Sequence, residues 1–170
     1  MLIPEPRRSY SRDLVSALAG LIRAKTGSAS LRDERAMFAA ALWAIRWDYG
    51  AAAYHAGDYA KVLEIARANL ATAHGLDDGR KEAVSMREIG HYFFEVGERP
   101  EAKRQYEAAL RIYDGLHDDE GVADCLNEIG AVHCAMGERA MAHEAFARTL
   151  AIRQSMRDEQ GIARALTNIG

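Results

Sequence analysis

The side chains best suited to chemistry in this sequence are six histidines and two cysteines, which could bind a metal ion. Zinc sites place their ligands at short, fixed spacings, and neither C-x-x-C nor H-E-x-x-H occurs here. His133 and Cys134 are neighbours in a segment with helical periodicity, so their side chains point to different sides of the helix. No sequence pattern marks a base that would activate Cys134 as a nucleophile. We therefore predict no metal site and interpret His133 as a packed core residue.

Two further patterns could indicate a phosphate-binding loop or a calcium site. The glycines do not form the motif G-x-x-x-x-G-K-[ST]. The acidic run HDDEG at residues 117–121 lacks the alternating ligands of an EF-hand loop. We interpret it as a turn followed by a helix N-terminus, where the helix dipole favours negative charge. Because the chain contains no catalytic constellation, we predict that it is not an enzyme and uses no cofactor.

The overall composition excludes two classes of partner. The 170 residues carry a formal net charge of -3, whereas a nucleic-acid-binding surface is basic and clustered. No run of about 18 apolar residues occurs, so we predict no transmembrane helix. The three prolines leave the chain free to be helical almost throughout, since proline inside a helix costs about 3 kcal/mol. We expect neither nucleic acid nor membrane as a partner.

The cysteines and the amino-terminal segment predict a cytoplasmic location. Cys125 and Cys134 fall in one predicted helix, where nine residues span roughly 13 Å. A disulfide needs Cα atoms within about 7 Å, so we expect both thiols to be reduced. The apolar run at residues 14–22 is short, and Arg23 and Lys25 follow where a secretion signal needs small residues. We interpret this run as an amphipathic helix.

An internal repeat of forty residues organises most of the chain. Such a fixed period is the mark of a solenoid, in which successive units must stack to bury their apolar faces. The columns that keep this register are Gly50, Gly90, Gly130 and Gly170; Gly57, Gly97 and Gly137; Leu70, Leu110 and Leu150; Asp78, Asp118 and Asp158; and Ala83, Ala123 and Ala163.

Each repeat has the pattern of two helices. Gly97 and Gly137 stand where the first helix ends, because glycine adopts positive φ cheaply. Pro100 fits the first turn of the following helix, and Asp118 can cap the helix after it. Gly90 lies in mid-helix, where glycine costs about 1 kcal/mol relative to alanine. We predict that the second helix approaches such glycines closely through its small residues, Ala102 and Ala142.

These columns resemble the tetratricopeptide repeat, whose pattern is a large apolar residue, Leu-Gly, an aromatic residue, and then alanine followed by a ring four residues later. The period of forty is similar to that of the longer-helix variety found in polarity scaffolds, kinesin light chains and bacterial regulators. The resemblance implies an all-α, right-handed superhelical solenoid of antiparallel helix pairs, with an extra N-terminal helix. The matching residues are Met86, Ile89, Gly90, Phe93, Ala102 and Tyr106 in repeat two, and Leu126, Ile129, Gly130, His133, Ala142 and Phe146 in repeat three.

The domain boundaries follow from the register. Residues 1–30 form an extension whose helix, opened by Ser11, either caps the array or mediates dimerisation. Ser30 opens a long helix from Leu31 to about His55. The array covers residues 31–170, with repeats at about 37–76, 77–116 and 117–156 and a truncated fourth at 157–170. Since the fourth repeat lacks its second helix, we expect a fragment of a longer protein whose apolar edge invites self-association.

The resemblance also implies a concave groove lined by the first helix of each repeat. An alternative is that the rings of this set bury themselves against neighbouring repeats. The positions before each Leu-Gly include the acids Asp48, Glu88 and Glu128, which favour partners with basic side chains. The groove residues predicted in this way are Trp47, Tyr54, His55, Arg87, His91, Phe94, Glu95, Asn127, Cys134 and Arg164.

The resemblance implies that the chain binds a protein or peptide, as a scaffold or as a regulatory module. The alanine- and arginine-rich sequence is similar to bacterial signalling proteins in which such arrays precede an output domain. The alternative hypothesis is a homodimerisation module that positions such a domain, for example a diguanylate cyclase, a kinase or a transcription regulator.

Overall fold

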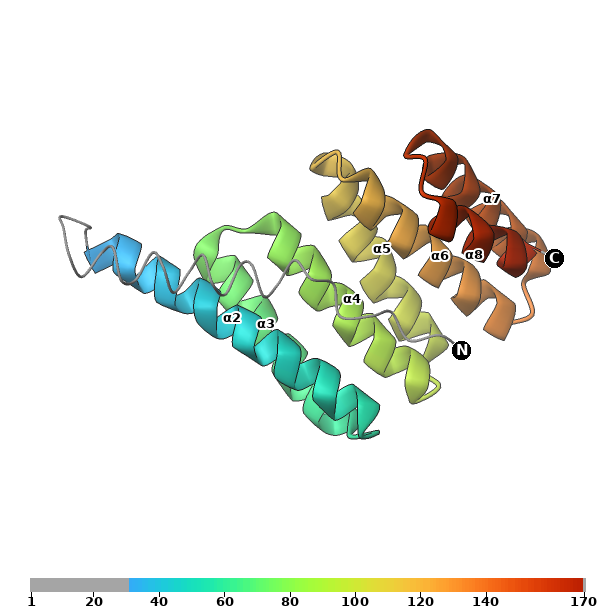
Figure 1. Ribbon diagram of the computed structural model, residues 1–170. Coiled ribbons are helices and arrows are strands. Elements are labelled where there is room, and N and C mark those ends of the chain that lie inside the picture. Colours follow the sequence, from blue (N-terminus) through green and yellow to red (C-terminus); the bar gives the residue numbers. More distant parts are fainter. Residues whose placement is uncertain (1–30, 170) are drawn as a thin grey trace. The chain divides into compact units, whose positions relative to one another are not determined.

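The computed structural model describes residues 31–169, which are helical except at the turns and contain no strand (Figure 1). The chain divides into two compact units between Asp78 and Gly79, and each unit is described separately. The predicted N-terminal helix and its caps at Ser11 and Ser30 lie outside the described residues. The helices are α2 (Leu31–His55) and α3 (Tyr59–Leu76) in the first unit, and α4 (Gly79–Glu95), α5 (Arg99–Gly115), α6 (Asp119–Ala135), α7 (Arg139–Ser155) and α8 (Glu159–Ile169) in the second.

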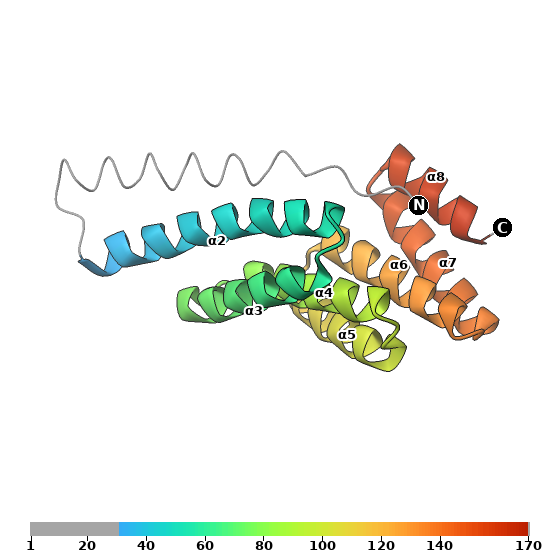
Figure 2. The ribbon, with the colours of Figure 1, turned by 90° about the horizontal axis from the view of Figure 1, so that it is seen from below.

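Consecutive helices pack as antiparallel pairs, which confirms the all-α solenoid predicted from the sequence. In the first unit α2 contacts α3, and in the second α4 contacts α5 and α6 contacts α7. Figure 2 shows α6 and α7 side by side. We call α2, α4, α6 and α8 the first helices and α3, α5 and α7 the second helices. Within residues 31–169 no helix is long and apolar enough to cross a membrane.

Left-handed backbone residues recur at both kinds of turn. Glycine supplies them between a first and a second helix, with φ of 91° at Gly97 and 78° at Gly137. This confirms the predicted role of both glycines. Between a second and a first helix the left-handed residue is not glycine, and His117 has a φ of 53°. Asp77 and Arg157, forty residues before and after His117, adopt the same conformation. L-residues pay a steric cost there, so these positions carry backbone strain.

The predicted helix cap at Asp118 forms, and Asp158 caps the corresponding helix of the next repeat. The Asp118 side chain accepts a hydrogen bond from the Gly121 amide at 3.1 Å, and Asp158 accepts one from Gly161 at 2.9 Å. Each bond satisfies a backbone N–H that has no partner within its own helix. Pro100 lies in the first turn of α5, where its missing N–H costs nothing.

The mid-helix glycines are covered by rings. A Cβ atom added to Gly90 would lie 2.6 Å from Tyr106 Cε1, and one added to Gly130 would lie 2.5 Å from Phe146 Cε1. The predicted close approach of the second helix is therefore confirmed, but its predicted residues are wrong. Ala102 and Ala142 are buried one turn earlier, and the rings that follow them fill the space that a methyl group would need.

The first unit buries its own small core between α2 and α3. Trp43 is completely buried, and the buried residues of α3 include Val62 and Ile65. Three large apolar residues of α2 remain outside this core. Phe38, Ile45 and Tyr49 are 61%, 52% and 58% exposed.

Candidate functional site

A network of charged side chains connects the first helices of the second unit. Arg87 on α4 donates through Nη1 to Asp124 Oδ2 and through Nε to Glu128 Oε2, both at 3.1 Å. Its Nη2 donates to Glu128 Oε1 at 2.5 Å, which makes a two-pronged ion pair with the carboxylate on α6. The three side chains are between 11% and 17% exposed, so water screens them little.

His91 extends this network one turn further along α4. Its Nε2 lies 2.8 Å from Glu128 Oε1, and its Nδ1 lies 3.4 Å from Glu88. Burial alone would lower the pKa of His91, but the negative charge of Glu128 raises that pKa to about 10. Burial likewise opposes ionisation of Glu128, yet Arg87 and His91 lower its pKa to about 2. His91 is therefore a cation and Glu128 an anion at neutral pH.

Arg153 joins the network from α7. Its side chain is only 6% exposed, and its Nη1 donates to Asp158 Oδ2 at 2.9 Å. Its Nη2 donates to Asp124, the carboxylate that also receives Arg87. Buried charges are tolerated when they are paired in this way. Arg153 stands forty residues after the buried Tyr113, so repeat three has a buried cation where repeat two has a buried aromatic ring.

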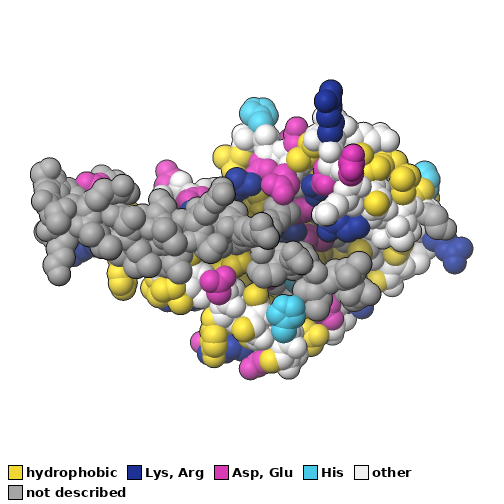
Figure 3. Space-filling view, in the orientation of Figure 1, with side chains coloured by type: hydrophobic (Ala, Val, Ile, Leu, Met, Phe, Trp, Pro, Cys, Tyr) yellow, Lys and Arg dark blue, Asp and Glu magenta, His cyan; other side chains and the backbone are white. Residues whose placement is uncertain are grey.

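A second link between first helices is uncharged. Asn168 Nδ2 on α8 donates to Asn127 Oδ1 on α6 at 2.8 Å. The two residues stand 41 positions apart, as do Arg87 and Glu128. Figure 3 shows acidic and basic side chains intermixed on the face of the second unit turned toward the viewer. Both side-chain bonds between successive first helices therefore join the same two adjacent columns of the repeat.

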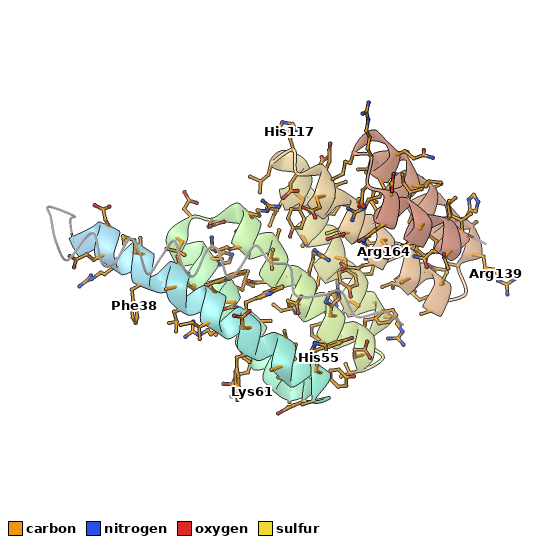
Figure 4. All side chains as sticks on the ribbon, in the orientation of Figure 1. Phe38, His55, Lys61, His117, Arg139 and Arg164 are labelled. Carbon is orange, nitrogen blue, oxygen red and sulfur yellow. The ribbon has the colours of Figure 1, made fainter. Side chains whose placement is uncertain are left out.

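Seven of the ten predicted groove residues belong to the second unit. Arg87 and His91 both contact Glu128. From the sequence alone, Glu128 was predicted only to favour partners with basic side chains. Phe94 is covered by Arg99, whose Cζ lies 4.2 Å from the ring centroid, a cation–π contact. Asn127 and Glu95 are half-buried. Cys134 and Arg164 are exposed, and Arg164 lies on α8 (Figure 4).

The other three predicted groove residues belong to the first unit. Trp47 stacks on the buried Trp43, with ring centroids 5.5 Å apart. Tyr54 meets Tyr59 edge to face at 5.7 Å. His55 is exposed at the end of α2 (Figure 4). Trp47 and Tyr54 are half-buried, so each ring both packs locally and presents part of its surface.

His133 is a core residue, as the sequence indicated. It is 5% exposed, and its Nδ1 lies 2.5 Å from Glu138 Oε2. Over the described residues, no three histidine, cysteine, aspartate or glutamate side chains are grouped so that they could hold a metal ion. Cys125 is buried and Cys134 is exposed, and neither forms a disulfide.

Comparison with known proteins agrees with this geometry. Residues 97–155, which include α5, α6 and α7, match the sequence model of the tetratricopeptide repeat. Residues 97–155 therefore carry tetratricopeptide repeats. Their paired helices, with rings packed over mid-helix glycines, account for the forty-residue pattern.

A solved structure shows the same fold. The crystal structure of BtubC (BKLC) from P. vanneervenii superimposes with a TM-score of 0.67 at 17% sequence identity. The similarity covers 95% of this chain and 64% of the BtubC chain, so this chain spans less than two thirds of that protein's length. The comparison with curated proteins gave no match.

Proposed function

We propose that this chain binds a protein partner through the first-helix face of its second unit, which we define as Phe94, Glu95, Asn127, Cys134, Arg164 and Asn168. Tetratricopeptide repeats generally mediate protein–protein interactions, and the match over residues 97–155 is the observation that carries the proposal. The residues of this face lie on α4, α6 and α8.

The asparagine pair supports an extended peptide as the ligand. A side-chain amide has two donor hydrogens and an acceptor oxygen, and the bond between Asn168 and Asn127 uses only part of this capacity. The Asn127 amino group and the Asn168 oxygen can therefore pair with the C=O and N–H of a peptide backbone. Such contacts supply affinity, while neighbouring side chains select the sequence.

The charge network supports the proposal by fixing the surface in advance. Arg87, His91 and Arg153 connect α4, α6 and α7 through Asp124 and Glu128. A face that is already ordered loses less entropy when it binds a ligand. Because the charges of Asp124 and Glu128 are matched internally, we expect peptide binding to depend weakly on salt concentration.

A displayed library of random peptides, selected on the 170-residue chain, tests the proposal. Peptides enriched on the wild-type protein should bind the double variant Asn127→Ala, Asn168→Ala at least about tenfold more weakly, as expected for lost hydrogen bonds to a buried peptide group. His143→Ala is the matched control, because His143 is exposed on the second helix α7. If the enriched peptides bound the double variant and the wild type equally well, the asparagine pair would not be part of the binding site.

Homodimerisation is the second candidate function, and α2 is the helix that favours it. Phe38, Ile45 and Tyr49 are spaced by seven and four residues, so they share one side of the helix, and all three are more than half exposed. Figure 4 labels Phe38 on this helix. Sedimentation velocity should show a dimer that the variant Ile45→Glu converts to a monomer. A wild-type monomer at every concentration would remove this candidate.

The wider context remains a prediction. We propose that the chain works as a regulatory module in the cytoplasm, attached to an output domain by analogy with bacterial signalling proteins.

A further inference from the structure

A cavity of about 200 Å³ lies in the second unit between the second helices α5 and α7. Leu126, Ile129 and His133 of α6 line it and are buried, so they form its floor. Leu110 on α5 and the exposed Met141 on α7 line its sides. We call this space the His133 cavity. None of the residues that line it belongs to the first-helix face defined above.

His133 places one polar atom without a partner at this floor. Its Nδ1 lies 2.5 Å from Glu138 Oε2, and because a carboxylate accepts, Nδ1 is the donor. The neutral ring then presents Nε2 as an acceptor. Among residues 31–169, no group forms a hydrogen bond with this Nε2. The fully buried side-chain atoms that lack a partner in this range lie on Asn69 and Arg99, so Nε2 of His133 retains access to the cavity.

The preceding repeat indicates that packing alone does not require a histidine at this position. Phe93 stands forty residues before His133 and packs against the core cluster that contains Tyr106. Repeat two therefore has a ring without polar atoms in this column, whereas repeat three has a ring whose orientation is fixed by Glu138. The exchange of phenylalanine for histidine adds a hydrogen-bond acceptor to an otherwise apolar floor.

The size and chemistry of the His133 cavity fit one phenol ring. A cavity of about 150 Å³ lined by apolar side chains binds benzene, so this larger cavity has room for a ring with one substituent. Tyrosine carries its hydroxyl at the far end of the ring, where it can donate to His133 Nε2 while the ring contacts Leu126 and Ile129. Phenylalanine would bury Nε2 without a partner, which is unfavourable. The Met141 thioether packs favourably against aromatic rings.

The charged side chains that line the cavity select the residues beside such a ring. They are Glu107 on α5 and Glu144 and Arg148 on α7, two acids and one base. Glu107 lies 3.8 Å from Lys103, whereas Glu144 is exposed and forms no ion pair within the part of the chain that the structure describes. A basic residue next to the ring would therefore meet an opposite charge. A phosphate on the ring would instead bring negative charge toward the acids, which is unfavourable.

We propose that the His133 cavity binds a tyrosine side chain of a protein partner, and that a lysine or arginine lies next to this tyrosine. The ring occupies the cavity, its hydroxyl donates to His133 Nε2, and the basic neighbour pairs with Glu144. The site lies on α5, α6 and α7, so it goes beyond the first-helix face and shares no residue with it.

A displayed peptide library with a fixed central tyrosine tests the proposal. It is selected on the 170-residue chain carrying Asn127→Ala and Asn168→Ala, because these substitutions weaken ligands of the first-helix face. We expect the enriched peptides to carry lysine or arginine beside the tyrosine. In fluorescence anisotropy with the wild-type chain, replacing the tyrosine by phenylalanine should weaken binding at least about fivefold, as for one lost hydrogen bond. Phosphorylation of the tyrosine should weaken binding at least as much.

Two variants separate the hydrogen bond from the charge. On His133→Phe, which places in this column the residue type that repeat two has there, the tyrosine and phenylalanine peptides should bind equally well. The matched control His143→Phe, at an exposed position of α7, should keep the preference for tyrosine. Glu144→Lys changes only an exposed side chain and should remove the advantage of a basic neighbour, so it tests the site even where His133→Phe does not fold.

Four results would overturn the proposal. They are equal binding of tyrosine and phenylalanine peptides by the wild type, a tyrosine preference that survives in folded His133→Phe, an advantage of basic neighbours that survives in Glu144→Lys, and no enrichment of tyrosine peptides on the folded chain. A negative result here leaves the first-helix face untouched, because the test of that face uses Asn127 and Asn168.

Discussion

Gly130→Ala should destabilise the protein although alanine is the better helix former. The substitution gains about 1 kcal/mol of helix propensity. The new methyl group would meet three Phe146 ring atoms at 2.5, 2.7 and 2.9 Å, and that ring is 4% exposed, so it has little room to move. Overpacking of this kind costs about 1–3 kcal/mol. We expect a net loss of about 1 kcal/mol, which lowers the Tm by about 2–4 °C in a chain of this size.

The sign of the effect should reverse when the ring is absent. In a Phe146→Ala background the methyl group fills space instead of colliding, so Gly130→Ala should raise the free energy of unfolding by up to about 1 kcal/mol. Gly115→Ala is the matched control, because Gly115 lies in α5 with no atom within 4 Å of the added Cβ. Urea unfolding of the four proteins in the cycle provides the measurement. If Gly130→Ala stabilised the protein while Phe146 was present, the proposed ring-over-glycine packing would be refuted.

Three further perturbations follow from the turns and the charge network. The pKa of His91 is raised from 6.5 to about 10, so the stability that its charge contributes is complete below pH 6.5 and is lost as the pH rises toward 10. The urea midpoint of the wild type should therefore fall over this pH interval by more than the midpoint of the variant His91→Gln. Equal falls would contradict the pairing of His91 with Glu128. Arg153→Met leaves Asp124 without one of its two cations and should lower the free energy of unfolding by about 3 kcal/mol, measured by urea or thermal unfolding. A change below about 0.5 kcal/mol would mean that the ion pair contributes no stability. His117→Gly relieves a positive φ of 53° and should add about 0.5–1 kcal/mol of stability, and a measured loss would show that the His117 side chain makes a stabilising contact.

The helices could be predicted from the sequence because their boundaries are set locally. Each helix boundary depends on residues that lie within a few positions of it in the sequence. Examples are the ends of the helix Leu31–His55, the loops at Gly97 and Gly137, and the cap at Asp118. Their side-chain and backbone chemistry is therefore visible in a short window of sequence. The forty-residue period predicted which helices pair, since repeats of this kind must stack.

The contacts over the glycines and the charge network needed three-dimensional information. The glycine columns indicated a close neighbour, but only the helix crossing shows that Tyr106 and Phe146, rather than the alanines before them, provide it. Arg87 and Glu128 are 41 residues apart, and no local rule pairs them. Opposite charges in adjacent columns of successive repeats were the available signal, and the same acids also fit an interpretation as partner-binding groups.

The central claim is that the first helices of the second unit present the binding face for an extended peptide. The most direct measurement follows the side-chain amide resonances of Asn127 and Asn168 by NMR as a peptide selected on this chain is added. The account predicts that both resonances shift together and saturate with the affinity measured for the peptide. Saturable shifts confined to α7, for example around the exposed Met141, with both asparagine resonances unmoved, would contradict it.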